Sequence, residues 1–379
     1  MDNISPKFLI PFELQDAVRF SPCTDTRSDT DILSSLNRHL PVSSERNIWT
    51  YWHSGVLSMP EWQQRNVCDW VRKCGPSWTV RVLDDVPNSP NHALKYIPQD
   101  QVPACFRDRT MDGPYVGQHS ADSIRGACLY AHGGVYFDRI CWEKLEDLES
   151  PFRVCASLVN GNMIANYFIA AKCDRFIKRW HEVFCGLWEE KTNYKGVSQH
   201  PLLKNLGLHW TNNELWSDKF NFDLKVDAQT LFEYTTQMDR FNGAEYWQTH
   251  VLLFDTMAET VGAEETIGWG GGGPKLFELL SLKLEADSNS VTYKEAYNMV
   301  WRILTRSSMQ KIAGSKMLKT LNLDTLWSMP ENKGKDREPG TFAELLRYGA
   351  VNFAQTRESP VYVGAPPPLK PAKKRHLEP

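Results

Sequence analysis

The sequence lacks any hydrophobic run long enough to span a membrane, since no stretch approaches about 18 to 20 uninterrupted apolar residues. Its beginning, MDNISPKFLIPFELQD, also lacks the basic and then apolar segments of a secretion signal. We therefore expect a cytoplasmic protein with no membrane partner.

A surplus of positive charge and the spacing of a disulfide or zinc framework are missing as well. The chain carries 43 Lys+Arg against 46 Asp+Glu, so its net charge of -3 argues against a protein that coats DNA. Its nine cysteines are odd in number and include no C-x-x-C pair, which argues against a disulfide scaffold and a zinc ribbon. Most lie in apolar runs, where cysteine is typically a small buried hydrophobic residue.

What is present indicates an α/β fold. IWTYWHSG and TVRVLDD have the composition of buried strands, and the segment between them has helical spacing from Pro60 to Gly75. Strand, helix and strand in this order predict a parallel pairing, with ligands at the carboxyl ends of the strands. Four polar residues follow those ends, and we predict that they bind substrate: His53, Ser54, Asp84 and Asp85.

The segment QHSADSIRGACLYAHGGVYFDRICW carries the clearest candidate chemistry. A helix capped by Ser120 and ended by Gly133-Gly134 would place Asp122 and Arg125 on one face. A short strand would follow and end at Asp138 in the same cleft. We predict that Asp122, Arg125 and Asp138 are catalytic, although the first two could form a surface pair and Asp138 could belong to a turn. Two histidines are further substrate-binding candidates, His119 and His200.

The rest of the chain sets the expected domain limits. Residues 1–45 are predicted to be a poorly ordered lead-in with one short helix, and residues 359–379 a disordered Pro/Lys-rich tail. Between them, 46–175 would form the sheet core, including strands in FRVCASLV and MIANYFIAA, and 176–358 a mainly helical part. Trp180, Phe184 and Trp188 recur at spacing four and predict a buried helix face.

Several segments together resemble a known family. They are IWTYWHSG with VRVLDD, SADSIRGACLYAHGGVYFD, NYFIAAKCDRFIKRWHEVFCGLW with HPLL, and LDTLWSMPENK with PGTFAELLRYG. In this order they resemble the glycosyltransferase family 32-like, capsule-polysaccharide-synthesis-type proteins of fungi. The resemblance covers about residues 46–358. It implies a glycosyltransferase-A (GT-A) fold, a mixed sheet flanked by helices with a helical C-terminal part.

The same resemblance implies roles for the candidate residues. Asp122 and Arg125 would contact a nucleotide or its phosphates, and Asp138 would be the carboxylate beside a divalent metal, Mg²⁺ or Mn²⁺. Relatives continue with further acidic or apolar residues after this position, whereas here Arg139 follows at once. One carboxylate next to a cation is a poor metal site. Either a segment is missing from the gene model, or the reaction needs no metal.

The second explanation leads to the function we favour from sequence. Arginine-containing cyclodipeptide synthases are fungal secondary-metabolite enzymes associated with proteins of this kind, and they use arginyl-tRNA and a second aminoacyl-tRNA as substrates. An aminoacyl ester is already activated, so the reaction requires positioning and a base but no cofactor. A carboxylate among Asp84, Asp85, Asp122 and Asp138 would hold the arginine side chain. The alternatives are a metal-dependent nucleotide-sugar glycosyltransferase and a degenerate transferase scaffold acting as a binding protein.

Overall fold

The computed structural model describes residues 6–113, 116–136, 154–159, 163–172, 175–193, 201, 251–255, 273–306, 323–356 and 362–363. These residues fall into two compact units that alternate along the chain. The helical unit draws on segments 1–38, 56–80 and 255–361, and the sheet unit on segments 39–55, 81–254 and 362–379. Each unit is therefore made of three separate segments of the chain, whereas the predicted division has a single boundary at residue 175. The boundaries at 46, 175 and 358 stay predictions.

A mixed sheet organises the sheet unit. Among the described residues its strand order is β3-β2-β4-β6-β5-β7-β9. Strand β4 pairs parallel to β2 and antiparallel to β6, and β5 pairs antiparallel to β6. The predicted α/β class with a mixed sheet is therefore confirmed. The strands are β2 (Asn47–Tyr51), β3 (Thr79–Leu83), β4 (Gly134–Tyr136), β5 (Val154–Val159), β6 (Met163–Ala171), β7 (Val251–Asp255) and β9 (Tyr362–Val363).

Helix α4 (Val116–His132) carries the predicted catalytic segment into strand β4. It begins at Val116, so Ser120 lies inside the helix and is not its cap. The predicted end is confirmed, because Gly133 and Gly134 have φ of 62° and 108°. A side chain is strained at such angles, and a Cβ at Gly134 would lie 2.7 Å from the carbonyl oxygen of Asn47 on the neighbouring strand.

We expect Gly134→Ala to lower the free energy of unfolding by about 2 kcal/mol, because the new methyl group would meet both the positive φ and the backbone of Asn47. Denaturant unfolding measures this change. Gly340→Ala is the matched control: it also has positive φ, at 74°, but nothing lies within 4 Å of the added Cβ. Equal losses in the two variants would show that contact with Asn47 contributes nothing.

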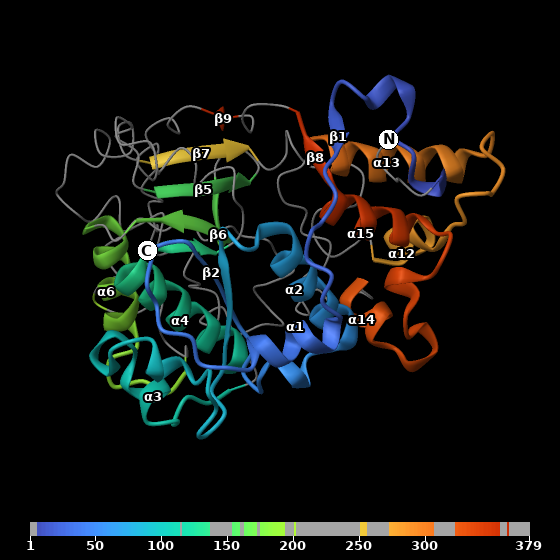
Figure 1. The fold of residues 1–379 in the computed structure, drawn as a ribbon. Helices are drawn as coiled ribbons and strands as arrows, with labels where there is room; N and C mark the ends of the chain where they lie inside the picture. The colour runs from blue at the N-terminus through green and yellow to red at the C-terminus, as the bar shows by residue number, and fades with distance from the viewer. Residues whose placement is uncertain are drawn as a thin grey trace, which may run out of the picture. The chain divides into compact units, whose positions relative to one another are not determined.

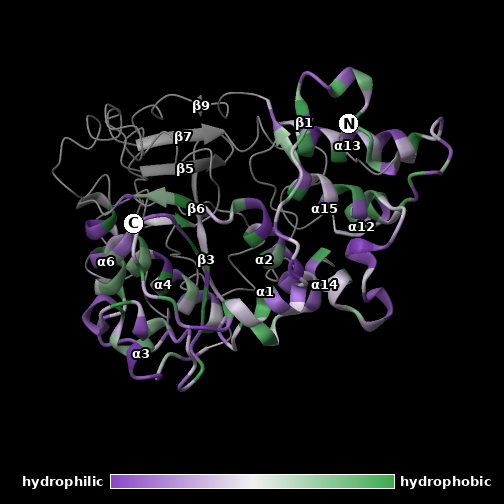
Figure 2. Cartoon of the chain, viewed as in Figure 1, coloured by the Kyte–Doolittle hydropathy of each residue, from purple (hydrophilic) through white to green (hydrophobic). Residues whose placement is uncertain are grey.

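The core of the sheet unit lies between the sheet and helices α4 and α6 (Arg175–Leu187), which pack against each other. Figure 1 shows these two helices grouped on one side of the strands. The predicted buried face of α6 is confirmed, since Trp180, Phe184 and Trp188 are each 1% exposed. Figure 2 shows hydrophobic and hydrophilic residues along both helices, as expected for elements with one buried side. The short helix α3 (Ala104–Arg107) precedes α4.

The helical unit has a core of its own, built mainly from α12, α13 and α15 with Trp62 from α2. A two-stranded antiparallel sheet of β1 and β8 accompanies it. The elements of this unit are β1 (Val18–Phe20), α1 (Asp29–Leu36), α2 (Glu61–Cys74), α12 (Gly273–Ser281), α13 (Val291–Arg306), α14 (Leu323–Ser328), α15 (Phe342–Asn352) and β8 (Phe353–Gln355). Short 3-10 helices are Pro6–Phe8, Phe12–Leu14, Val56–Ser58, Pro330–Asn332 and Lys335–Arg337 here, and Ala93–Lys95 and Gln99–Gln101 in the sheet unit.

The N-terminal segment differs from the predicted lead-in. The expected short helix is α1, which has a capping box: the Ser28 hydroxyl accepts from the Asp31 amide, and the Asp31 carboxylate accepts from the Ser28 amide. However, Val18 and Ile32 are buried, at 1% and 0% exposure, so the segment is packed. The polar composition of this segment gave no sign that these two apolar residues would be buried.

Of the predicted tail, only Tyr362–Val363 is described, paired with β7, and disorder in the remainder stays a prediction. Within the described ranges no helix has the length and apolar character to cross a membrane.

Candidate active site

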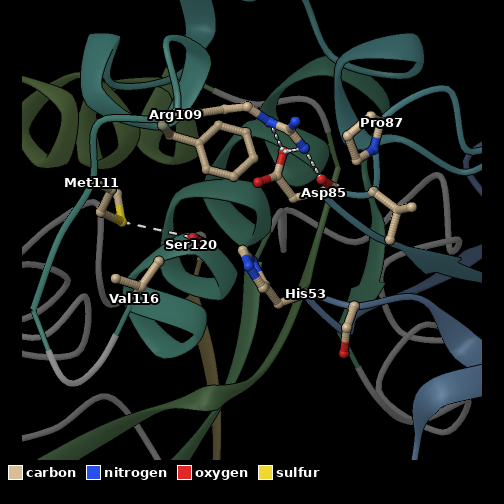
Figure 3. A pocket seen from close by; sticks show the side chains of 10 residues that line it. His53, Asp85, Pro87, Arg109, Met111, Val116 and Ser120 are labelled. Atoms are coloured by element: carbon tan, nitrogen blue, oxygen red, sulfur yellow. Dashed lines mark hydrogen bonds and ion pairs between the residues drawn. The ribbon is translucent and has the colours of Figure 1, made fainter.

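A pocket of about 430 Å³ opens where strands β2 and β3 end, within the sheet unit. Its volume lies in the range of small-molecule sites, and its place agrees with ligand binding at the carboxyl ends of strands. Figure 3 shows Asp85 and Arg109 on one side of it, with His53 and Ser120 facing them. The described residues lining it are His53, Ser54, Asp85, Val86, Pro87, Phe106, Arg109, Met111, Val116 and Ser120.

Asp85 and Arg109 form the charged wall of this pocket. The Arg109 Nη2 donates to Asp85 Oδ1 at 3.2 Å and also to the Asp85 carbonyl, while His92 Nε2 lies 3.3 Å from the same Oδ1. Arg109 has a left-handed backbone, φ 58°, in the loop after α3. This conformation is costly for a non-glycine residue and is common where function requires a particular side-chain direction.

Asp84 lies beside this wall but plays a different part. It is 2% exposed, its Oδ2 accepts from the Ser89 hydroxyl at 2.6 Å, and its Oδ1 accepts from the Val86 amide at 3.1 Å. These bonds fix the turn that follows β3. Asp84 is not among the lining residues, so the structure separates it from Asp85, although we predicted substrate contact for both.

His53 joins the two strand ends. Its carbonyl oxygen accepts from the Asp85 amide at 3.1 Å, and its Nδ1 lies 3.1 Å from the Tyr51 hydroxyl. Ser54 follows it on the pocket wall. The structure therefore brings together three of the predicted substrate-binding residues, His53, Ser54 and Asp85, in one cavity.

Asp122 and Arg125 form an ion pair on α4, with 2.9 Å between Asp122 Oδ1 and Arg125 Nη1. The predicted shared helix face is confirmed. Their side chains are only 12% and 8% exposed, and neither is among the described lining residues. Asp138 and His200 lie outside the described residues, so the predicted convergence of Asp122, Arg125 and Asp138 stays a prediction.

His119, the remaining candidate, lies inside α4 and is 6% exposed. Its ring packs edge-on against Trp188, 5.5 Å between centroids, and it is not among the described lining residues. Burial lowers the pKa of His119 to about 4, so its ring is neutral at physiological pH. Such a histidine serves the packing of α4 against the end of α6.

The lowered pKa of His119 predicts a loss of stability in acid. Between the ordinary pKa of 6.5 and about 4, the unfolded state binds a proton that the folded state does not, so the free energy of unfolding falls as pH falls. We expect this histidine to contribute about 3 kcal/mol to that decline. Urea unfolding across this window measures it. His119→Phe keeps an aromatic ring against Trp188 and should flatten the slope; an unchanged slope would contradict the prediction.

Among the described residues, the buried cysteines do not supply an alternative centre. Burial raises the pKa of the Cys105 thiol to about 11 and that of Cys68 to about 12, so neither is a thiolate at neutral pH. Over the part of the chain that the structure describes, no three His, Cys, Asp or Glu side chains are grouped so as to hold a metal ion. Asp138, the one predicted metal ligand, lies outside the described residues.

Sequence reasoning missed Tyr51, Phe106, Arg109 and Met111. Tyr51 lies in an apolar strand pattern, which predicts that the residue is buried but gives no sign of a role at a site. Arg109 lies in a charged segment, RDRTMD, where adjacent charges normally indicate a solvated loop. Its approach to Asp85 depends on the fold, and no local signal could have found it.

Comparison with known proteins decides the family. A probable glycosyltransferase of Fusarium pseudograminearum, FCK3, is 43% identical and covers 98% of this chain and 99% of its own. The O-glycosyltransferase braB of Annulohypoxylon truncatum is 37% identical over 90% of this chain and 88% of its own length. The glycosyltransferase afumC of Aspergillus fumigatus is also 37% identical, over 87% of this chain and 91% of its own length. The chain belongs to the fungal glycosyltransferases.

The resemblance inferred from sequence is thereby confirmed at the level of glycosyltransferases. No family model and no solved structure matches the chain. As a fungal glycosyltransferase the protein is a transferase, and the relatives favour the nucleotide-sugar alternative over the cyclodipeptide synthase that we favoured from sequence. Nothing in these relatives supports aminoacyl transfer, and the use of aminoacyl-tRNA stays a prediction without support.

Proposed function

We propose that the protein transfers a sugar from a nucleoside-diphosphate sugar to a hydroxyl group of a small molecule. Similarity to glycosyltransferases along nearly the whole chain carries this proposal. The relative braB is named an O-glycosyltransferase, which favours a hydroxyl acceptor. In this reaction the acceptor oxygen bonds to the anomeric carbon, the bond from that carbon to the diphosphate breaks, and the hydroxyl proton passes to a base.

The pocket between β2, β3 and α4 suits the donor. It offers a hydrophobic wall from Phe106 and Met111 and hydrogen-bonding groups at His53 and Asp85. Arg109 adds a guanidinium, which binds phosphate oxygens in paired hydrogen bonds. A base and ribose need apolar contact and directed polar groups, while a diphosphate needs positive charge, and the pocket supplies both.

The sheet supports a GT-A-type scaffold for this reaction. Parallel β2 and β4 are followed by an antiparallel β6, and the pocket residues His53 and Asp85 follow β2 and β3. Asp122 and Arg125 remain proposed contacts of the donor. Helix α4 carries both of them and also Ser120, which lines the pocket.

A divalent cation is the cofactor that the family resemblance implies. The described residues do not fit it on their own, because they include no group of three suitable ligands and Asp85 Oδ1 already lies against Arg109 and His92. We therefore assign no step to a metal. Mg²⁺ or Mn²⁺ beside Asp138 stays a proposal, which activity with EDTA and its recovery with either ion would test.

The experiment supplies the purified protein with UDP- and GDP-sugars and a panel of phenols and alcohols. We expect release of one nucleoside diphosphate and a glycoside of matching mass. A parallel reaction contains charged tRNAs, including arginyl-tRNA, with and without ribonuclease. No glycoside together with a ribonuclease-sensitive diketopiperazine would overturn the proposal and restore the cyclodipeptide synthase. No product in either reaction, with bound nucleotide, would support a binding protein.

A further inference from the structure

Tyr51 and His53 form a polar pair at the end of β2. The Tyr51 side chain points into the sheet unit, where the residue is 7% exposed, and its hydroxyl reaches back to His53 Nδ1 at 3.1 Å. The two rings meet edge to face with 6.4 Å between centroids. One ring nitrogen of His53 is thus held by a buried group of the protein.

The direction of this contact depends on where the proton of the His53 ring lies. Burial raises the pKa of the Tyr51 hydroxyl and outweighs a hydrogen bond with Ser120 that lowers it, so the phenol keeps its proton. Imidazole nitrogen is a better acceptor than the hydroxyl oxygen of Ser120, which favours donation from the Tyr51 hydroxyl to Nδ1. A neutral histidine that accepts at Nδ1 carries its one ring proton on Nε2.

His53 lines the pocket, and its Nδ1 is the ring nitrogen that meets Tyr51. In Figure 3 the ring projects between Ser120 and Asp85. Among the described residues, Tyr51 is the hydrogen-bond partner of this side chain, through Nδ1. An N–H in a cavity beside the Arg109 guanidinium is suited to an anionic or carbonyl oxygen of a ligand.

We propose that Tyr51 is a positioning residue that holds His53 in the Nε2–H tautomer, so that His53 donates a hydrogen bond to an oxygen of the nucleotide donor. This inference rests on the proposed function for the identity of the ligand. The tautomer does not depend on it, which allows the two to be tested separately.

The tautomer is read by NMR of the full chain labelled with ¹⁵N in the histidine rings, at about pH 8, where an ordinary histidine is neutral. His53→Gln identifies the signal. We expect the Nε2–H pattern in the wild type and a change of the Nδ1 shift in Tyr51→Phe, because the donated hydrogen bond is lost. The Nδ1–H pattern, or a signal that Tyr51→Phe does not change, would overturn the positioning role whether or not sugar transfer is observed.

Ligand contact is tested by adding UDP and GDP separately to the labelled protein and by sugar-transfer kinetics. We expect the better-binding nucleotide to shift the His53 Nε2 signal. For the donor, His53→Ala should raise KM roughly tenfold with little change in kcat, the effect of one lost hydrogen bond. His53→Gln places an amide N–H near the Nε2 position and should recover most of this loss.

The outcomes separate the two proposals. If sugars are transferred but His53→Ala leaves donor KM unchanged, His53 does not contact the donor and the inference fails alone. If sugar transfer by His53→Gln is as slow as by His53→Ala, and NMR of the wild type shows no proton on Nε2, the ring acts as a base and the inference is again wrong. If no sugar is transferred and neither nucleotide shifts the signal, the proposed function and the ligand contact both fail, and only the tautomer remains.

Discussion

Asp336→Ala is expected to lower the free energy of unfolding by about 3–5 kcal/mol, the usual effect of removing one member of a buried charge cluster. The Asp336 side chain is 1% exposed and accepts from Arg65 Nε at 2.9 Å and from Arg65 Nη2 at 2.5 Å. Arg347 Nη2 lies 2.7 Å from Asp336 Oδ2, the oxygen that also accepts from Arg65 Nε. Alanine would remove the carboxylate that the two guanidinium groups share, leaving Arg347 its pair with Asp69 and Arg65 only a longer contact of 3.5 Å with Glu61.

Chemical denaturation of the wild type and the variant measures this change. Glu295→Ala is the matched control in the same unit, because its ion pair with Lys275 is nearly half exposed and should contribute less than about 1 kcal/mol. Similar small losses in both variants would show that the cluster around Asp336 contributes no more than a surface pair.

The same cluster sets a dependence on pH. Burial alone would raise the pKa of Asp336, but the guanidinium groups of Arg65 and Arg347 more than offset it and hold the pKa below its ordinary value of 3.8. The stabilisation is therefore complete above the ordinary carboxyl range and is lost as pH falls through the lower folded-state pKa. The pH range over which Asp336 loses its stabilising effect lies below the corresponding range for His119.

Local sequence patterns predicted the elements around the site because each element has its own periodicity. The aromatic run at Asn47–Tyr51, the helical spacing over Glu61–Cys74 and the second strand at Thr79–Leu83 all lie where expected. What the patterns could not show was which parts pack together. Helix α2 belongs to the helical unit although its flanking strands are neighbours in the sheet. Such packing depends on residues distant in the sequence.

The candidate site shows the same limit at the scale of single residues. Strand ends identified His53, Ser54 and Asp85, but nothing local distinguishes Asp85 from Asp84. Adjacent residues of an extended chain point to opposite sides, so one carboxylate lines the pocket and the other fixes a turn.

The preference for aminoacyl transfer had a different origin. It rested on the residue that follows Asp138, outside the described part of the chain, and on the argument that one carboxylate beside a cation is a poor metal site. Relatives that span nearly the whole chain carry more weight than one short segment. The pocket is compatible with them because its positive group, Arg109, comes from a loop that the sequence argument did not consider.

Arg109→Ala is expected to lower kcat/KM for sugar transfer by about 10²-fold or more, as removal of a group that stabilises developing charge commonly does. The guanidinium lies on the pocket wall and is held by Asp85, so it is already oriented when a diphosphate arrives. As the diphosphate leaves with the bonding electrons, its negative charge grows, and a fixed cation favours that state. Initial rates with the donor sugar measure the effect.

Arg107 supplies the control, since it lies two residues away in the same segment and pairs with the exposed Asp108. Arg107→Ala removes the same charge from the protein but none from the described pocket wall, so its kcat/KM should equal that of the wild type. Arg109→Lys keeps the charge but loses the paired geometry, and we expect an intermediate rate. If Arg107→Ala and Arg109→Ala lower kcat/KM equally, the net charge of the loop affects the rate and the position of Arg109 on the pocket wall does not. If neither falls, the diphosphate binds elsewhere, and the pocket at the ends of β2 and β3 is not where the donor reacts.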